Sequence, residues 1–457
     1  MAEKQAVALE ELTTLVDSGQ RQKLRLLLNE QHPADLAEFF EEMDPPHRLS
    51  CFRLLDLDNA SAVLAELDSD NQCELLTSLG DIGVVPIIAR MSPDDAADVL
   101  SELPPEKATE IIEQISDVET RVDLKQLLLF EDDTAGGIMS TDYLSLFARM
   151  SVGEALIQLR QMYEDLEEDI YDIYVVDENE RLVGRVTVKE LLTVDPKAQV
   201  ESVMDTDVPK VTTATDQEEA AELVGRYDLL TLPVVDDAGR LCGIITADDV
   251  IDVLREEATE DIYQSSGISA GEPGEALTYN VGKAFSARLP WLLITLGIET
   301  GSATVITHFD SVIQQTVAAA SFMPLLSGVT GSVATQSTCI VIRGTSSRSQ
   351  LNLKTIFRNI FHELKVGMLL GVFCGIFTYI ISLLIHNSRQ ELGIVVAFSL
   401  TLTMTVGVVI GTTMPLLFQK LGIDPAHASG PFITSILDVS TMTIYLTIVH
   451  YFLSHLI

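Results

Sequence analysis

The sequence predicts a multidomain membrane protein: an all-α superhelical N-terminal domain, a repeated α+β module, a connecting helix and an all-α domain of five membrane helices. The 457 residues have a formal net charge of −39, although their mean hydropathy is +0.26. Residues 1–280 carry 62 acids and 20 bases, whereas residues 281–457 carry 6 acids and 9 bases. An acidic soluble part joined to a lipid-dwelling part excludes a simple cytosolic enzyme. The acidity also argues against nucleic-acid binding, because phosphate recognition needs a basic face.

Residues 1–131 have the composition of short helices, since Leu, Ala and Glu dominate between proline breaks. The segment ASAVLAEL at 60–67 recurs as AADVLSEL at 96–103, and LAEFFEEM at 36–43 resembles both. Repeated helix pairs of this kind predict a small superhelix rather than a compact bundle. Most of the acids are expected on a solvated face, and a few are candidate metal ligands.

Residues 132–253 contain a clearer repeat, with units at about 132–195 and 196–253. The run IYVVDENERLVGRVTVKELL at 173–192 matches LPVVDDAGRLCGIITADDVI at 232–251 at an offset of 59 residues. Each unit has the pattern of an extended segment, a helix, two strands joined by a turn, and a second helix. The repeat resembles a tandem pair of cystathionine-β-synthase (CBS) domains.

The resemblance to CBS domains implies a nucleotide site. In that family the pattern Gly-x-x-Ser/Thr-x-x-Asp places a hydroxyl and a carboxylate beside the ribose of an adenine nucleotide. The second unit fits this pattern with Gly243, Thr246 and Asp249, whereas the first unit has Glu190 in place of the Asp. ATP is therefore a candidate ligand. The alternative is that both units only maintain the fold.

A connecting helix is predicted at 254–283, and helical sequence already begins at about residue 248. Along it, acids at steps of three or four residues form a negative stripe: Asp249, Asp252, Glu256 and Glu260. A solvated acidic face is the usual explanation of such a run. Like charges crowded together repel unless divalent cations lie between them. The stripe therefore also predicts a sensor that compacts when it binds magnesium.

The membrane domain is predicted at 284–457. It contains five apolar stretches long enough to cross a hydrocarbon core: 289–309, 314–342, 364–386, 392–418 and 431–454. Basic residues gather between the second and third stretches: Arg343, Arg348, Lys354, Arg358 and Lys365. Basic loops stay in the cytoplasm. Counting crossings from this loop, we expect a cell-membrane protein whose N-terminal domains lie in the cytoplasm and whose C-terminus lies outside.

Small residues recur at four-residue spacing in two of these stretches. The third contains Gly367, Gly371 and Gly375, and the fourth contains Gly407 and Gly411. Small residues at this spacing let membrane helices approach closely. We therefore expect these glycines to serve helix packing.

Two acids lie inside the apolar stretches. Asp438 shares a predicted helical face with Thr434, Thr441 and Tyr445. An ionised Asp facing lipid is costly, so it should face a wet cavity or a cation, although a structural hydrogen-bonded Asp is the alternative. Glu299 in the first stretch poses the same question, and neighbouring hydroxyls could satisfy it as a buried acid.

The second stretch contains Pro324, Gly328 and Gly331, which predict an interrupted helix. Backbone carbonyls freed at such a break can bind or replace the hydration shell of a cation. Magnesium suits such a site because it gives up water reluctantly and is often held by one or two carboxylates and waters.

The order of these parts resembles the MgtE family of magnesium channels over essentially the whole chain. The most specific match is DPAHASGPFITSILDVSTMTIYL at 424–446, with RLPWLL at 288–293 a second. The resemblance implies a homodimer in which Asp438 binds hydrated Mg²⁺ on the pore axis, with Thr434 and Gly328 as neighbouring candidates. The chain departs from the family at GVTGSVATQ (328–336), where Ser332 stands in place of an amide side chain. Glu299 is outside the family pattern.

The resemblance also implies a gate, in which cytoplasmic Mg²⁺ fills acidic sites between the helical domain, the CBS pair and the connector and holds the pore shut. The candidate regulatory ligands are Asp94, Asp95, Asp98, Asp249, Asp252, Glu256, Glu257 and Glu260. One alternative is a secondary transporter of another divalent cation, such as cobalt, with the CBS pair as an energy sensor. Another is a membrane-anchored sensor that conducts nothing. No enzyme class applies to the transport step, because it makes no covalent bond.

Overall fold

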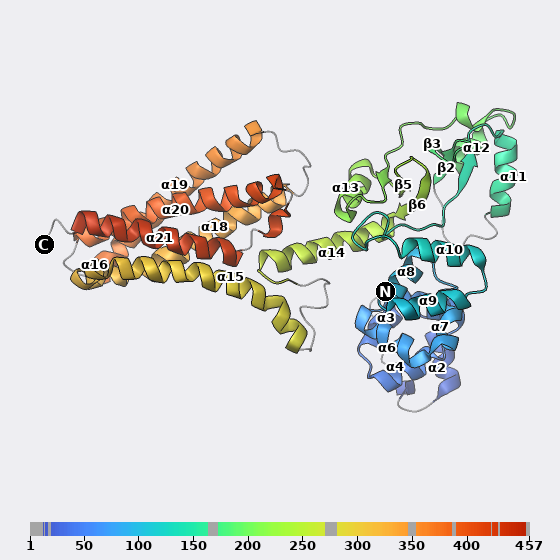
Figure 1. Cartoon of the computed structure of the whole chain (residues 1–457), viewed down its shortest axis with the longest axis horizontal. Coiled ribbons are helices and arrows are strands. Elements are labelled where there is room, and N and C mark those ends of the chain that lie inside the picture. The colour runs from blue at the N-terminus through green and yellow to red at the C-terminus, as the bar shows by residue number, and fades with distance from the viewer. Residues whose placement is uncertain are drawn as a thin grey trace. The chain divides into compact units, whose positions relative to one another are not determined.

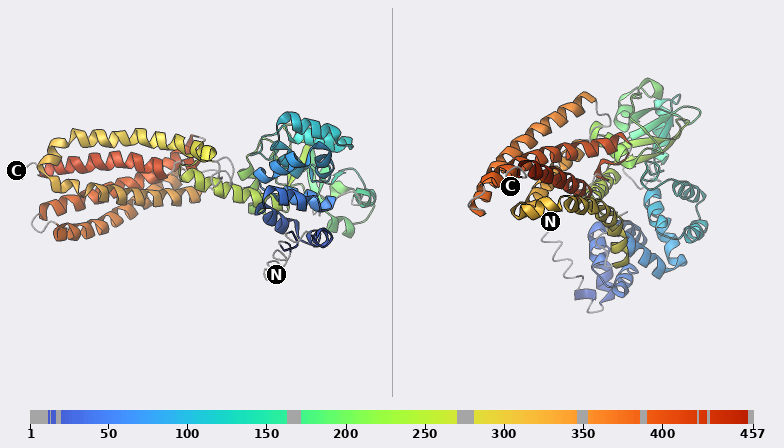
Figure 2. Two further views of the ribbon diagram at one scale, coloured as in Figure 1. Left: turned by 90° about the horizontal axis from the view of Figure 1, so that it is seen from below. Right: turned by 60° about the vertical axis from the view of Figure 1, so that its left-hand side comes forward.

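The computed structural model describes residues 12, 14–16, 20–162, 172–269, 281–345, 353–385, 390–421, 423–427 and 430–453. The chain divides into two compact units, residues 1–254 and residues 255–457 (Figures 1 and 2). The first unit contains short helices and two small sheets, and the second contains long apolar helices. This arrangement confirms the predicted fold class.

The N-terminal domain consists of short helices whose starts are set by proline and aspartate. The helices are α2 (Arg21–Leu28), α3 (Pro33–Glu41), α4 (Pro45–Phe52), α5 (Leu57–Glu66), α6 (Ser69–Leu79), α7 (Asp81–Ile88), α8 (Pro93–Ser101), α9 (Pro105–Gln114) and α10 (Val118–Leu127). Proline occupies the first turn of α3, α4, α8 and α9, where no intrahelical N–H bond is lost. Aspartates cap other helices by accepting backbone N–H bonds, as Asp56 does from Asn59.

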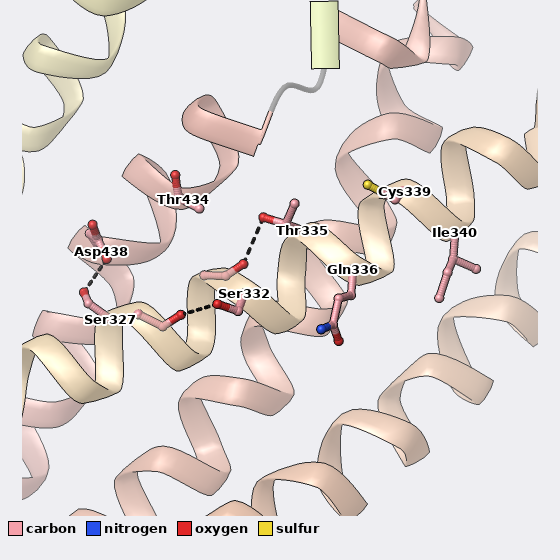
Figure 3. A pocket seen from close by; sticks show the side chains of 10 residues that line it. Ser327, Ser332, Thr335, Gln336, Cys339, Ile340, Thr434 and Asp438 are labelled. Atoms are coloured by element: carbon pink, nitrogen blue, oxygen red, sulfur yellow. Dashed lines mark hydrogen bonds between the residues drawn. The ribbon is translucent and has the colours of Figure 1, made fainter. Parts of the chain in front are cut away.

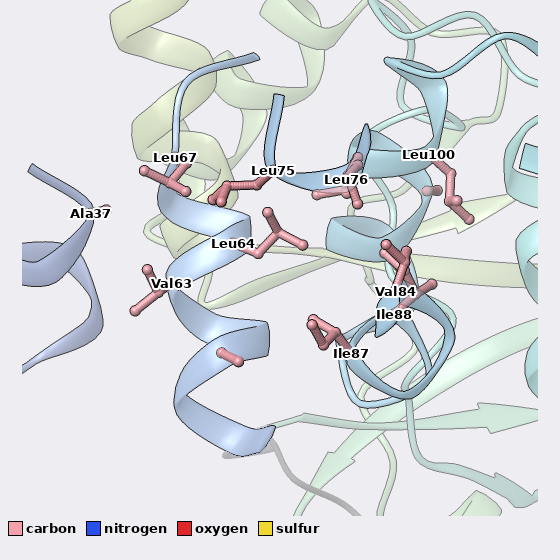
Figure 4. Close-up of a cluster of buried hydrophobic side chains, with 14 of the residues drawn as sticks. Ala37, Val63, Leu64, Leu67, Leu75, Leu76, Val84, Ile87, Ile88 and Leu100 are labelled. Atoms are coloured by element: carbon pink, nitrogen blue, oxygen red, sulfur yellow. The ribbon is translucent and has the colours of Figure 1, made fainter. Parts of the chain in front are cut away.

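Alternate helices of this domain pack on one another, which produces the predicted superhelix. Helix α3 packs on α5, α5 on α7 and α7 on α9, while α4 packs on α6 and α6 on α8. Leucines and isoleucines such as Leu64, Leu76, Ile88 and Leu100 fill the space between the two rows (Figure 4). The same hydrophobic core continues into the second CBS unit and into Val250 and Val253 of the following helix.

The two CBS units have the same topology. The first comprises β1 (Ser145–Phe147), α11 (Val152–Met162), β2 (Asp172–Val176), β3 (Leu182–Thr187), α12 (Val188–Thr193) and the 3₁₀ turn η1 (Val200–Ser202). The second comprises β4 (Val211–Thr212), α13 (Gln217–Tyr227), β5 (Thr231–Val235), β6 (Leu241–Thr246) and α14 (Ala247–Ser265). In each sheet the first strand is parallel to the second, and the third is antiparallel. Helix α14 continues from the second unit as one helix to residue 265, so the connecting helix has no separate start.

The hairpin turns of the two units have the same backbone geometry, although one has Gly239 where the other has Glu180. Asp177 and Asp236 accept backbone N–H bonds at matching turns. Gly239 lies in the left-handed region with a φ of 80°, and Glu180 takes the same role in the first unit with a φ of 62°. Backbone bonds from Leu182 to Gly239 and from Leu241 to Glu180 join the two hairpins.

The second unit contains five helices of sufficient length and apolarity to cross a membrane, counted over the described residues. Its helices are α15 (Val281–His308), α16 (Asp310–Gln315), α17 (Val317–Ala320), α18 (Met323–Thr345), α19 (Leu353–Ile385), α20 (Gln390–Lys420) and α21 (Gly430–Leu453), with the 3₁₀ turn η3 (Pro425–His427) before α21. In both figures the long helices lie side by side as a bundle.

The expectation that the second stretch breaks at its glycines is wrong. The chain is interrupted earlier, between α16, α17 and α18, and α18 then runs without a break through Gly328 and Gly331. Pro324 lies in the first turn of α18, where a proline costs no helical hydrogen bond.

The glycine spacing serves packing, as expected. A Cβ on Gly371 would lie 2.9 Å from the Thr401 carbonyl oxygen of α20, and one on Gly411 would lie 2.4 Å from the Ala334 carbonyl oxygen of α18. Helix α20 therefore meets α19 and α18 backbone to backbone, which only glycine allows.

Candidate functional site

A cavity of about 790 Å³ opens between α18 and α21 (Figure 3). Its lining, apart from one isoleucine, consists of polar or small residues: Ser327, Gly328, Gly331, Ser332, Thr335, Gln336, Cys339, Ile340, Thr434 and Asp438. The three predicted pore residues, Asp438, Thr434 and Gly328, therefore all line this one cavity. We call it the α18–α21 cavity.

Asp438 is half-buried and accepts a hydrogen bond from the hydroxyl of Ser327. Figure 3 shows these two side chains pointing toward one another from α21 and α18. Gly331 permits the close approach of the two helices, since a Cβ there would lie 3.1 Å from the Thr434 methyl carbon. The sequence did not single out Ser327, because its contact with Asp438 spans 111 residues.

The other members of the predicted Asp438 face do not line the cavity. Thr441 is 1% exposed and Tyr445 is fully buried, and the Tyr445 hydroxyl donates to the Ala319 carbonyl oxygen at 2.7 Å. Spacing along one helix predicts a shared face, but neighbouring helices cover the distal half of this face.

Hydroxyl groups take the place that was expected of backbone carbonyls. The Ser332 hydroxyl donates to the Gly328 carbonyl oxygen at 2.7 Å, and the Thr335 hydroxyl donates to the Gly331 carbonyl oxygen at 3.0 Å. The Thr434 hydroxyl likewise donates to the Pro431 carbonyl oxygen at 3.0 Å. A hydroxyl that donates its proton to its own helix retains only acceptor lone pairs. These hydroxyl oxygens leave hydrogen-bond acceptors on a cavity wall whose exposed surface is otherwise mainly carbon.

Glu299, the other of the two acids within the apolar stretches, lies on α15 close to Asp438 of α21. It is half-buried, and Ser435 of α21 lies beside it. The sequence identified both acids but could not pair them, because the contact depends on how α15 packs against α21.

A second group of acids forms within residues 1–254, between the N-terminal domain and α14. Asp95 of α8 lies near Asp248 and Asp249 of α14, and Glu66 of α5 lies near both Asp95 and Asp252. We call these five residues the acidic interface. Asp95, Asp249 and Asp252 were predicted as regulatory ligands from the sequence; Glu66 and Asp248 were not, because their acidic neighbours come from another domain.

Three of these acids, Asp249, Asp95 and Glu66, have raised pKa values, chiefly because of burial and then because of neighbouring acids. Burial raises the pKa of Asp249 to about 6 against the hydrogen bond from Thr246, and Asp248 adds a smaller upward effect. Loss of solvent contact also raises the pKa of Asp95, opposed by the hydrogen bond from Ser92 and assisted by Asp248. Burial, Asp252 and Asp95 raise the pKa of Glu66. For Asp249, Asp95 and Glu66 the ionised form is therefore less favourable than in a free carboxyl group, and a nearby cation would favour it again.

The remaining regulatory candidates lie elsewhere. Asp94 is buried in α8 and Asp98 is exposed on the same helix, whereas Glu256, Glu257 and Glu260 lie on the part of α14 that belongs to the second unit. There the pKa of Asp261 is raised to about 6, chiefly by burial and then by Asp424. Within the part of the chain that the structure describes, no three acids, histidines or cysteines are arranged as a ready metal cluster.

The predicted nucleotide motif has a complete local explanation. A Cβ on Gly243 would lie 2.6 Å from the Ser140 carbonyl oxygen, so only glycine fits. The Thr246 backbone N–H and hydroxyl both donate to Asp249, which closes the first turn of α14. In the first unit Thr187 and Glu190 form the same capping box at α12. These contacts account for the motif without a ligand, and they leave its role in nucleotide binding a prediction.

The fold and the two sites define a multi-pass membrane protein in which an acidic helical domain and a CBS pair precede a five-helix domain with a polar cavity. Residues 31–133 match the MgtE intracellular N domain, residues 135–197 and 200–256 match the CBS domain, and residues 323–448 match the MgtE family described as a divalent cation transporter.

Whole-chain relatives agree with these matches. The chain is 35% identical over 445 residues to the magnesium transporter MgtE of Bacillus subtilis, covering 97% of this chain and 96% of the relative. It is 35% identical over 453 residues to the magnesium transporter MgtE of Thermus thermophilus, covering 98% of each. A solved cytosolic domain of the Mg²⁺ channel MgtE in complex with ATP is 38% identical, with a TM-score of 0.51, covering 54% of this chain and 99% of that one. The chain belongs to the MgtE family.

Proposed function

We propose that this chain transports Mg²⁺ across the membrane, down its electrochemical gradient, through the α18–α21 cavity. The observation that carries the proposal is the position of Asp438, a membrane-embedded carboxylate on the wall of a polar cavity. An acid at this depth marks an ion pathway when it faces water. The relatives are named magnesium transporters, which favours Mg²⁺ over the alternative of another divalent cation such as cobalt.

The hydroxyl and carboxylate oxygens on the cavity wall suit a hydrated cation. Waters around Mg²⁺ point their hydrogens outward, and they can donate to Asp438 and to the lone pairs of Ser332, Thr335 and Thr434. Mg²⁺ dehydrates reluctantly, so a site that accepts from its water shell costs less than one that replaces it. We propose a homodimer in which two such walls face one another, with the N-terminal domains in the cytoplasm and the C-terminus outside.

The native thiol of Cys339 offers a test of the pathway. Cys339 is exposed and lines the same cavity as Asp438. We expect a cationic methanethiosulfonate reagent to lower Mg²⁺ flux into liposomes at least about fivefold, because an exposed thiol reacts readily and the attached group adds bulk and positive charge to the cavity.

The matched control is Cys339→Ser, which keeps a small polar side chain and should conduct but resist the reagent. Mass spectrometry would report whether Cys339 is labelled. Full labelling of the unsubstituted chain with unchanged flux would show that ions do not pass through this cavity.

We propose further that cytoplasmic Mg²⁺ closes the pathway by binding at the acidic interface. The support is electrostatic: carboxylates from α5, α8 and α14 lie near one another there, and Asp249, Asp95 and Glu66 have raised pKa values. A divalent cation would offset their repulsion and hold the N-terminal domain to α14. Loss of the cation would release it.

Neutralising two of these acids should weaken the inhibition. For Glu66→Gln with Asp95→Asn we expect the internal Mg²⁺ concentration that halves the flux to rise about tenfold, because two attractive charges toward a divalent ion are lost. The control pair is Glu106→Gln with Glu110→Gln on exposed positions of α9. An unchanged inhibition curve for the first pair would contradict this gate.

ATP is proposed as a ligand of the CBS pair. The support is that Gly243, Thr246 and Asp249 match the nucleotide motif of CBS domains, and that a related cytosolic domain has been solved in complex with ATP. Because Asp249 belongs both to this motif and to the acidic interface, nucleotide and Mg²⁺ binding would be coupled at one carboxylate.

A further inference from the structure

The start of α19 carries basic and aromatic side chains on one exposed face. Five positions related by three, four or seven residues fall on one side of the helix: Lys354, Phe357, Arg358, Phe361 and Lys365. We call these five residues the basic face of α19. All five are exposed, and Phe357 and Phe361 are 71% and 59% exposed. Figure 1 shows the start of α19 diverging from α18 and α20.

The opposite side of α19 is packed against neighbouring helices, which fixes the direction of the basic face. A Cβ on Gly367 would lie 2.9 Å from a Val408 methyl carbon, so α19 and α20 are in contact here. Glu363 is the only acid among residues 353–365, and it accepts a hydrogen bond from the Ser337 hydroxyl of α18 at 3.1 Å. The negative charge of this segment is therefore directed at α18, and the basic face points away from the bundle.

The basic face continues into an apolar face along the membrane-spanning part of α19. Met368, Val372 and Ile376 follow at four-residue steps and are all exposed. The candidate membrane span is Ile356–Leu384, so these three side chains lie at the depth of the acyl chains. A lipid bound along α19 would place its tails on this apolar face and its headgroup at the basic face.

The charges of the basic face favour an anion. The Lys365 ammonium lies 4.6 Å from the Phe361 ring centroid, a contact that holds the positive charge on this face. Lys354 lies in the first turn of α19, where the helix N-terminus adds partial positive charge and no acid compensates it. Basic residues immediately beside a membrane helix attract anionic lipid headgroups.

An anionic lipid matches both the charged and the apolar parts of this surface, whereas an acidic protein surface matches only the charged part. The aromatic and apolar side chains favour an apolar environment, because exposing them to water is costly. A phospholipid supplies acyl chains for these side chains and a phosphate group for the bases. A solvated acidic domain would supply only the negative charge.

We propose that the basic face of α19 binds the headgroup of an anionic phospholipid whose acyl chains lie along Met368, Val372 and Ile376. The phosphate group accepts hydrogen bonds from Arg358 and Lys365. This inference concerns a lipid site outside the α18–α21 cavity, and it does not depend on which ion the chain transports.

The test is a titration of the full chain in detergent with fluorescently labelled phosphatidylglycerol. The variant Arg358→Gln with Lys365→Gln removes two charges and keeps extended polar side chains. We expect its half-saturating lipid concentration to rise about 30-fold, because each base near an anionic surface contributes a factor of about five. Each single substitution should raise it about fivefold, which keeps the site testable if the double variant does not fold. Labelled phosphatidylcholine, which has no net charge, should bind the variants and the unsubstituted chain equally.

The matched control is Lys283→Gln with Lys420→Gln, which removes two exposed bases of α15 and α20 outside the basic face. Its affinity for phosphatidylglycerol should change less than about threefold. Equal weakening in both double variants would overturn the site, because the lipid would then respond only to the overall charge. Unchanged phosphatidylglycerol binding in the folded Arg358→Gln with Lys365→Gln protein would also overturn it. If that protein also loses dimer on size-exclusion chromatography, a second copy of the chain covers the basic face instead.

Discussion

Replacing Asp438 with asparagine should reduce Mg²⁺ flux at least about tenfold, because one full charge toward a divalent ion is removed at the site. Asparagine has nearly the same shape, and its side-chain oxygen can still accept the hydrogen bond that Ser327 donates to Asp438. The contact between α18 and α21 should therefore survive. The measurement is Mg²⁺ entry into liposomes, with elution volume and thermal midpoint reporting the fold.

The control for this substitution is Asp310→Asn. Asp310 is an exposed acid of the short helix α16 and lies outside the α18–α21 cavity. It should conduct as the unsubstituted chain does. A correctly folded Asp438→Asn protein with normal flux would show that the cavity carboxylate is structural, and the chain would then be a sensor or would conduct elsewhere.

The sequence was sufficient to predict the identity of the cavity acid but not its surroundings. Asp438 stands out because an acid in an apolar stretch is costly, and Thr434 follows from the helical period. Ser327 and Glu299 reach Asp438 from two other helices, and no periodicity along one helix encodes such contacts. These neighbours of Asp438 become visible only once the packing of α15 and α18 against α21 is known.

The error about the second stretch has a physical cause. Proline and glycine both weaken helices, so their clustering predicted freed carbonyls. Pro324 instead lies in the first turn of α18. A side chain at position 331 would crowd Thr434 of α21, so glycine there serves helix packing. Serine and threonine hydroxyls that bond back to helix carbonyls line the cavity in place of those carbonyls. In a membrane, glycine is as often a packing residue as a helix breaker.

The acidic interface shows a similar limit. The stripe on α14 was readable from its three- and four-residue steps, but the same spacing describes an ordinary solvated face. Glu66 and Asp95 become part of a site only because the superhelix places α5 and α8 against α14. Burial is the main cause of the raised pKa of Asp249, and Asp95 of α8 adds a small upward effect that the α14 sequence alone cannot reveal.

The largest expected effect on stability is that of Gly411→Ala. The added Cβ would lie 2.4 Å from the Ala334 carbonyl oxygen, which is a backbone atom and cannot move aside cheaply. The Thr338 hydroxyl also donates to the Gly411 carbonyl oxygen at 3.0 Å, so separating α18 and α20 would break this bond. We expect a cost of about 1–3 kcal/mol or more, seen as a lower thermal midpoint in detergent.

Gly297→Ala provides the opposite expectation within the same membrane domain. No atom lies within 4 Å of a Cβ built on Gly297, and alanine favours the helix over glycine by about 0.8–1 kcal/mol. The control should therefore melt at the same or a higher temperature than the unsubstituted chain. The same Gly→Ala substitution is thus expected to lower the thermal midpoint at position 411 but not at position 297. Equal midpoints for both variants would mean that α18 and α20 do not meet backbone to backbone at Gly411. The cavity between α18 and α21 would then lose the packed helix that supports α18 from its other side.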